Sequence, residues 1–74
     1  MFILTQNKTE VVNTSRCLSI RIVDSSTTIK AYGSGIDTWS RLGSYQTTER
    51  TKEVIQEINA ALCESRVSFD MPED

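Results

Sequence analysis

Hydrophobic and polar residues alternate along two neighbouring segments of the chain, and this period of two is typical of strands with one buried face. The first segment covers residues 17–24 and the second covers residues 27–32, with the polar turn Asp24–Ser26 between them. The pattern therefore predicts an antiparallel hairpin. The residues expected on its buried face are Leu18, Ile20, Ile22, Ile29 and Ala31.

A third strand is predicted over residues 36–46, after a turn at Gly33–Gly35 that suits a hairpin connection. Its alternation is less regular, although Trp39 and Arg41 share one side of the strand. Gly43 indicates either a β-bulge or a place where the helix packs closely on the sheet.

An amphipathic helix is predicted after the strands, because apolar residues then recur at steps of three and four. Thr47 or Thr48 is a suitable N-cap, and the helix should end near Glu64. The apolar stripe consists of Thr51, Val54, Ile55, Ile58, Ala61 and Leu62. We expect this stripe to cover the apolar face of the sheet, to which Leu42 also belongs.

The two ends of the chain are expected to be extended. Phe2–Thr5 reads as a short strand, Val11 and Val12 as a brief extended piece, and Val67–Met71 as a segment that adds an edge strand before Pro72. The prediction is a single α+β domain: a small antiparallel sheet of three to five strands covered on one face by a single C-terminal amphipathic helix. Strands occupy mainly residues 1–46, the helix 47–64, and an extended acidic tail 65–74.

Length and composition change this picture in one respect. The chain has 74 residues, of which 38% are hydrophobic and 24% charged, as expected for one folded domain. A domain of this size buries only about 60% of the surface that its unfolded chain exposes. Self-association is a common way to add buried area, so a homodimer is predicted.

The charge and hydropathy of the chain argue against two classes of partner. A formal net charge of −2 is unlike the basic surplus of most nucleic-acid binders, so nucleic acid is not the favoured partner. The longest apolar run, Phe2–Leu4, is far shorter than a membrane span, and no signal-peptide pattern is seen. The default expectation is a cytoplasmic protein in which Cys17 and Cys63 are thiols.

Catalytic chemistry is not predicted. The chain has no histidine, which excludes Ser–His and Cys–His nucleophiles and removes the commonest metal ligand. The turn at Gly33–Gly35 lacks the lysine and the spacing of a phosphate-binding loop. We therefore expect no cofactor, no metal and no enzymatic activity.

A possible interaction surface is predicted on the side of the sheet that the helix leaves uncovered. Its residues would be Arg21, Lys30, Tyr32, Trp39 and Arg41. Basic residues beside aromatic ones on a sheet can hold single-stranded nucleic acid. Large aromatics also anchor protein interfaces. Two simpler interpretations stay open: the cations offset the acidic helix, and the aromatics complete the core.

A sequence resemblance extends over most of the chain. The segment "LGSYQTTERTKEVIQEI", the "TQN" near the start and the "MP" near the end resemble small uncharacterised proteins of Gram-positive bacteria and their phages. The matching residues are Thr5, Gln6, Asn7, Leu42, Gly43, Tyr45, Thr47, Glu49, Arg50, Lys52, Glu53, Val54, Glu57, Ile58, Met71 and Pro72. Many of these relatives have alanine where this chain has Thr51. The resemblance implies a phage or prophage origin and no catalytic residue.

These observations favour a non-enzymatic protein-interaction module of phage or prophage origin, located in the cytoplasm of a bacterial host. Its expected partners are a second copy, a host protein, or both, and blocking a host defence protein is one function compatible with that origin. The alternative is a nucleic-acid-binding accessory protein that uses Arg21, Lys30 and Arg41. No membrane association is expected.

Overall fold

The computed structural model describes residues 1–35 and 38–74 of the chain. The elements are β1 (Phe2–Leu4), β2 (Val11–Asn13), a 3₁₀ helix η1 (Thr14–Arg16), β3 (Ser19–Val23), β4 (Thr28–Tyr32), β5 (Trp39–Ser44), α1 (Thr48–Cys63) and β6 (Ser68–Asp70). The strand predicted over residues 36–46 is thus observed as β5, and positions 36 and 37 lie outside the described residues.

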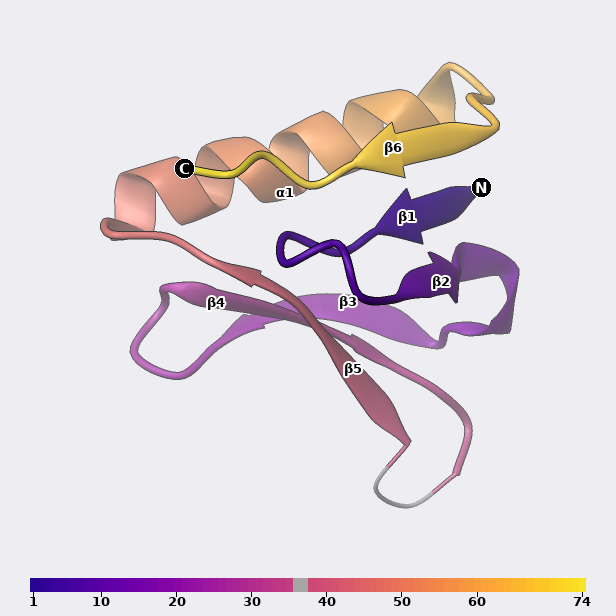
Figure 1. Ribbon diagram of the computed structural model, residues 1–74, viewed down its shortest axis with the longest axis horizontal. Coiled ribbons are helices and arrows are strands. Elements are labelled where there is room, and N and C mark those ends of the chain that lie inside the picture. The colour runs from indigo at the N-terminus through magenta and orange to yellow at the C-terminus, as the bar shows by residue number, and fades with distance from the viewer. Residues whose placement is uncertain (36–37) are drawn as a thin grey trace.

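The strands form two sheets of three (Figure 1). One sheet has the order β3-β4-β5, and both of its strand pairs are antiparallel. The other has the order β2-β1-β6, in which β1 is antiparallel to β2 and parallel to β6. The α+β class with a single helix over an antiparallel sheet is confirmed. The end segments add a second sheet to it rather than extending the first.

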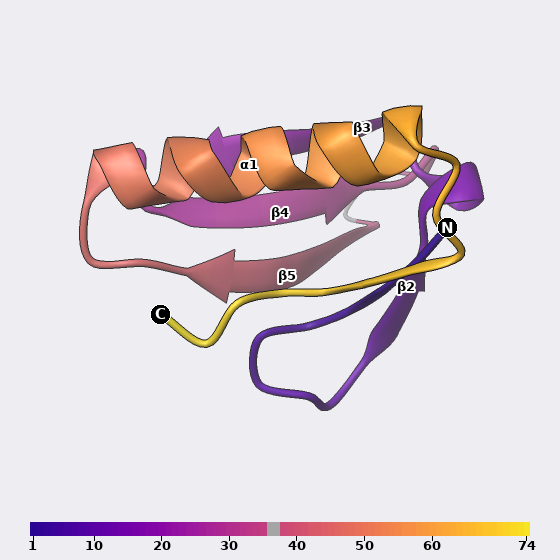
Figure 2. The same cartoon turned by 90° about the horizontal axis from the view of Figure 1, so that it is seen from above.

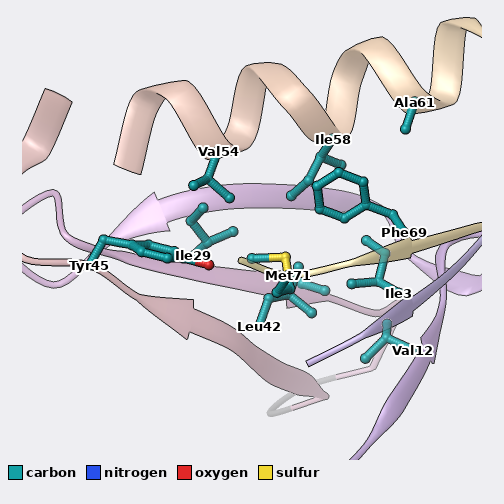
Figure 3. Close-up of a cluster of buried hydrophobic side chains, with 11 residues drawn as sticks. Ile3, Val12, Ile29, Leu42, Tyr45, Val54, Ile58, Ala61, Phe69 and Met71 are labelled. Carbon is teal, nitrogen blue, oxygen red and sulfur yellow. The ribbon is translucent and has the colours of Figure 1, made fainter. Parts of the chain in front are cut away.

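Helix α1 and the two sheets enclose one core (Figures 1 and 3). Each of the three supplies buried aliphatic residues, so none of them is dispensable for burial. The core consists of Ile3, Val12, Ile29, Ala31, Leu42, Tyr45, Val54, Ile58, Ala61, Phe69 and Met71. Phe69 and Met71 belong to the segment expected as an acidic tail, which therefore contributes directly to the core.

Helix α1 begins as the sequence predicts. Thr47 is the N-cap, and its side-chain oxygen accepts a hydrogen bond from the backbone N–H of Arg50 at 3.1 Å. Thr51 is fully buried, and its hydroxyl donates to the Thr47 carbonyl at 2.8 Å, which satisfies its polar atom within the helix.

Two residues predicted on the buried face are exposed. Leu18 is 74% exposed and Leu62 is 44% exposed. Leu18 lies just before β3 begins at Ser19, and Leu62 lies in the last turn of α1, so both stand where the packed elements end. The prediction for these two positions is wrong. Hydrophobic periodicity shows which way a residue points, but it does not show where the contact between the helix and the sheet ends.

A β-bulge in β5 explains the irregular alternation of that strand. Ile29 lies opposite Gly43 and Lys30 lies opposite Arg41, so Leu42 is an extra residue between these pairs. Arg41 and Leu42 lie on opposite faces, as alternation requires. The bulge shifts the residues that follow, so that Ser44 rather than Gly43 lies opposite Thr28 on the outer face. Of the two alternatives that Gly43 left open, the β-bulge is observed, and the atoms closest to Gly43 come from Gln6 and Tyr45 rather than from the helix.

Candidate interaction surface

The side of the β3-β4-β5 sheet that faces away from α1 carries the polar and aromatic residues of these strands. We call this side the outer face. Its residues are Ser19, Arg21 and Val23 from β3, Thr28, Lys30 and Tyr32 from β4, and Trp39, Arg41 and Ser44 from β5. On β4 the intervening residues Ile29 and Ala31 are buried in the core, and Thr28 at the start of the strand is buried as well, so the open part of this strand begins at Lys30.

The register brings all five predicted site residues together on the outer face. Lys30 lies directly opposite Arg21 on one side and Arg41 on the other, so the three cations form one row across the sheet. Tyr32 lies opposite Trp39 in the next row. Residues directly opposite each other in a sheet have Cβ atoms about 4.5–5.5 Å apart, so this arrangement is one continuous patch.

Two aromatic rings lie against two of the cations. The guanidinium carbon of Arg21 lies 4.5 Å from the centroid of the Tyr32 ring, and Nζ of Lys30 lies 4.0 Å from the centroid of the Trp39 ring. The electron-rich face of an aromatic ring attracts a cation. These contacts offset part of the repulsion that like charges opposite each other would otherwise produce.

The three cations differ in how far they are neutralised. Lys30 pairs with Asp24 at 3.5 Å, and only 17% of its side chain is exposed. Arg21 donates to the Ser19 hydroxyl at 3.0 Å and Arg41 to the Ser44 hydroxyl at 2.6 Å. Among the described residues, no carboxylate lies within ion-pair distance of either arginine. Both arginines are exposed, so their charge is presented to solvent.

Trp39 is the large aromatic residue of this patch and is 49% exposed. It does not complete the core, which was one of the two simpler interpretations of the sequence. Tyr32 is half-buried. A half-exposed tryptophan flanked by arginines is a combination that is enriched at the energetic centres of protein interfaces.

The sequence did not point to the serines and the aspartate that complete this surface. Ser19, Ser44 and Asp24 hold the three cations in place. The only available signal was the position of Asp24 at the end of β3, within reach of the neighbouring strand. The register needed to pair it with Lys30 could not be obtained from the alternation.

The cysteines and carboxylates are the other side chains that could carry chemistry. Cys17 and Cys63 are free thiols, and burial raises the pKa of the Cys17 thiol, which disfavours the reactive thiolate. In residues 1–35 and 38–74, no three Cys, Asp or Glu side chains gather closely enough to hold a metal ion. No helix within these same ranges has the length and apolar character required to cross a membrane.

Comparison with known proteins yields no relative. The chain matches no family model, and it has no significant match among curated proteins or among solved structures. The residues of the outer face are therefore the basis for assigning a function.

Proposed function

We propose that the chain is a non-enzymatic interaction module and that the outer face docks on an acidic surface of another protein. The observation that carries this proposal is the half-exposed Trp39 set beside the row Arg21–Lys30–Arg41. Trp39 would enter an apolar pocket of the partner, and Arg21 and Arg41 would meet carboxylates at its rim.

The physical argument rests on desolvation and charge. Burying the exposed part of Trp39 removes apolar surface from water and contributes favourably at about 25 cal/mol per Å². Arg21 and Arg41 already make hydrogen bonds to Ser19 and Ser44, so binding in this arrangement costs them less conformational entropy than it would cost unbonded arginines. A preorganised patch of this kind suits a specific partner.

The sequence resemblance supports a host protein as that partner. A small protein without catalytic residues acts by contact, and blocking a host defence protein is one such action that a phage or prophage origin would allow. A bacterial cytoplasmic protein with an acidic rim around an apolar pocket is the partner we propose.

A capture experiment with matched variants tests this proposal. A tagged chain is incubated with nuclease-treated lysate of a Gram-positive bacterium, and proteins recovered by the wild type are compared with those recovered by Trp39→Ala and Arg41→Gln. Val67→Lys is the control, because Val67 is 77% exposed and lies in the connection between α1 and β6. We expect a protein that both outer-face variants lose and the control retains. Recovery of the same proteins by Trp39→Ala as by the wild type would refute the proposal.

Single-stranded nucleic acid is the second candidate partner, and the row of three cations favours it. Against it, one ring face each of Tyr32 and Trp39 is occupied by the chain's own cations, which leaves less aromatic surface for stacking bases. Trp39 is the only tryptophan of the chain, so its fluorescence reports directly on the outer face. Titration with an oligothymidylate at low salt should leave this emission unchanged. Quenching that is reversed by salt and absent in Arg41→Gln would support nucleic-acid binding instead.

A further inference from the structure

A second surface, separate from the outer face, lies along the free edge of β3. An open groove of about 340 Å³ separates this edge from α1. Its apolar lining includes Leu18, Ile20, Ile55 and Leu62. Leu18 and Leu62 are the two residues that the sequence placed in the core and the structure leaves exposed.

The strand β3 is less well covered than its neighbour β4. On β4 the inward residues Ile29 and Ala31 are 0% and 3% exposed. On β3 the corresponding inward residues, Ile20 and Ile22, are only partly buried. The helix therefore does not complete the burial of this strand, and an apolar strip remains along the margin of the sheet.

The other sheet edges are short or blocked. The edge strands β2 and β6 have three residues each. The edge of β5 is closed by Gln6, whose backbone N–H donates to the Leu42 carbonyl at 2.8 Å. The Gln6 side chain also accepts from the Ser44 N–H at 2.8 Å and donates to the Ser44 carbonyl at 2.9 Å, as a neighbouring strand would.

The edge of β3, by contrast, has five residues and lies at the margin of the molecule (Figure 2), and no strand formed by residues 1–35 or 38–74 pairs with it on that side. Protected edges usually carry a proline, a bulge or an inward-pointing charge. The sequence of β3, SIRIV, contains no proline, and its charged residue Arg21 points to the outer face. The inner, apolar side of β3 therefore carries no charge or proline that opposes the addition of another strand.

The sequence of this edge is self-complementary in one antiparallel register. With Ile20 opposite Ile20 of a second copy, Leu18 lies opposite Ile22 on the inner side. On the outer side Arg21 lies opposite Ser19, the type of hydroxyl that Arg21 already uses within its own chain at 3.0 Å. A register centred on Arg21 would instead place two arginines opposite each other, which is destabilising.

We propose that the chain forms a twofold dimer through the edge of β3, with Ile20 at the symmetry axis. The two sheets then join into one continuous sheet of six strands. Ile22 of each copy covers Leu18 of the other and closes the groove beside Leu62. The outer faces of both copies stay open, so the dimer presents two docking surfaces, and the inference does not depend on the proposed function.

Light scattering after size-exclusion chromatography tests the dimer. The wild type should have twice the monomer mass of 8.3 kDa at high concentration and should dissociate on dilution. Leu18→Lys, which adds a charge to the edge at an exposed position, should raise the dissociation constant at least about tenfold. Val67→Lys is the control, with similar exposure elsewhere, and should dimerise as the wild type does. A wild type that stays monomeric into the millimolar range, or an unaffected Leu18→Lys, would overturn the inference.

Disulfide trapping tests the register in chains in which Cys17 and Cys63 are replaced by serine. Ser19→Cys mixed with Arg21→Cys, the two carrying tags of different size, should give a crosslinked heterodimer. Directly opposite residues have Cα atoms about 4.5–5.5 Å apart, within the range of a disulfide. Each variant alone should crosslink poorly, because the two thiols are then diagonal neighbours at about 7–8 Å. Efficient crosslinking of Arg21→Cys alone would show the register centred on Arg21 and contradict the one proposed.

Trp39→Ala separates the two proposals. This variant should dimerise normally while losing the captured partner, because Trp39 lies on β5, at the opposite edge of the sheet from β3. Loss of the dimer in Trp39→Ala, with no effect of Leu18→Lys, would place self-association on the outer face and refute the edge dimer.

Discussion

The two faces of the β3-β4-β5 sheet are built from the same three strands and differ in almost every property. The inner face carries Ile29 and Leu42, both fully buried, and packs against the helix and the second sheet (Figure 3). The outer face carries Trp39 and Arg41, both exposed. Alternate positions along one strand therefore serve the core on one face and, in the function that we propose, recognition on the other. Substitutions on the two faces should have separable effects.

The largest effect is expected on the inner face. Leu42→Ala removes a fully buried side chain and should lower the free energy of unfolding by about 2–5 kcal/mol. This is a large share of the roughly 4–11 kcal/mol expected for a chain of this length. Urea denaturation followed by circular dichroism measures the change. Leu42→Ile, which conserves volume, is the control and should cost less than about 1.5 kcal/mol. A loss below about 1 kcal/mol for Leu42→Ala would show that this face is not the principal source of stability.

A smaller effect is expected from the two tyrosines, one on each side of the sheet. The Tyr45 hydroxyl is directed into the core region and donates to the Pro72 carbonyl at 2.8 Å. Tyr45→Phe should cost about 1 kcal/mol, and Tyr32→Phe on the outer face should cost less. Thermal or urea denaturation of both variants at neutral pH checks the difference. Equal losses would mean that the faces do not differ in this way.

The environment of Tyr45 also predicts that the stability of the fold depends on pH in the alkaline range. Burial raises the pKa of Tyr45 from 10.0 to about 12, and the charge of Glu57 adds to this while Arg50 opposes it. The folded state therefore holds the phenolic proton more tightly than the unfolded chain. The resulting stabilisation is fully present below pH 10 and is lost as the pH rises towards about 12. The stability of the wild type should fall more steeply in this window than that of Tyr45→Phe, and parallel curves would contradict the assignment.

The smallest effect on stability is expected from Arg41→Gln, which should change the free energy of unfolding by no more than about 0.5 kcal/mol. Arg50→Gln provides the comparison on the helix. Arg50 pairs with Glu53 and Glu57, each at 3.2 Å, and the hydrogen bond to Glu53 together with the charge of Glu57 raises the pKa of Arg50. We expect Arg50→Gln to be the more destabilising of the two and Arg41→Gln to be the one that loses the partner. If denaturation showed Arg41→Gln to be the more destabilising variant and capture showed Arg50→Gln to lose the partner, the two arginines would not have the separate roles proposed for them.

The sequence predicted the parts of the fold that have a clear period. The strands β3 and β4 and the stripe of α1 alternate regularly, and the Thr47 cap marks the start of the helix. The second sheet could not be predicted in this way, because strands of three residues, such as β1 and β6, are too short to show a period. Their pairing depends on contacts between opposite ends of the chain.

The outer face was predictable to a similar extent. Alternation placed Arg21, Lys30 and Tyr32 on one side of the hairpin, and the structure brings them together with Trp39 and Arg41. The bulge at Leu42 decides how β5 joins this surface, and its position follows from the register with β4. The exposure of Leu18 and Leu62 was not predictable. The spacing of hydrophobic residues shows which face a side chain lies on, but it does not show how much of that face the helix covers.

The parallel pairing of β1 with β6 has a consequence for how the protein is made. Phe2 lies opposite Ser68 and Leu4 lies opposite Asp70. Strand β1 therefore cannot complete its pairing until β6 has been synthesised. The β3-β4-β5 sheet and α1 are complete in sequence before β6 leaves the ribosome, whereas Ile3 has no Phe69 beside it until then. Closing such a long loop is slow compared with forming a hairpin. A nascent chain arrested shortly before Ser68 should therefore expose the side of Ile3 that the finished molecule buries.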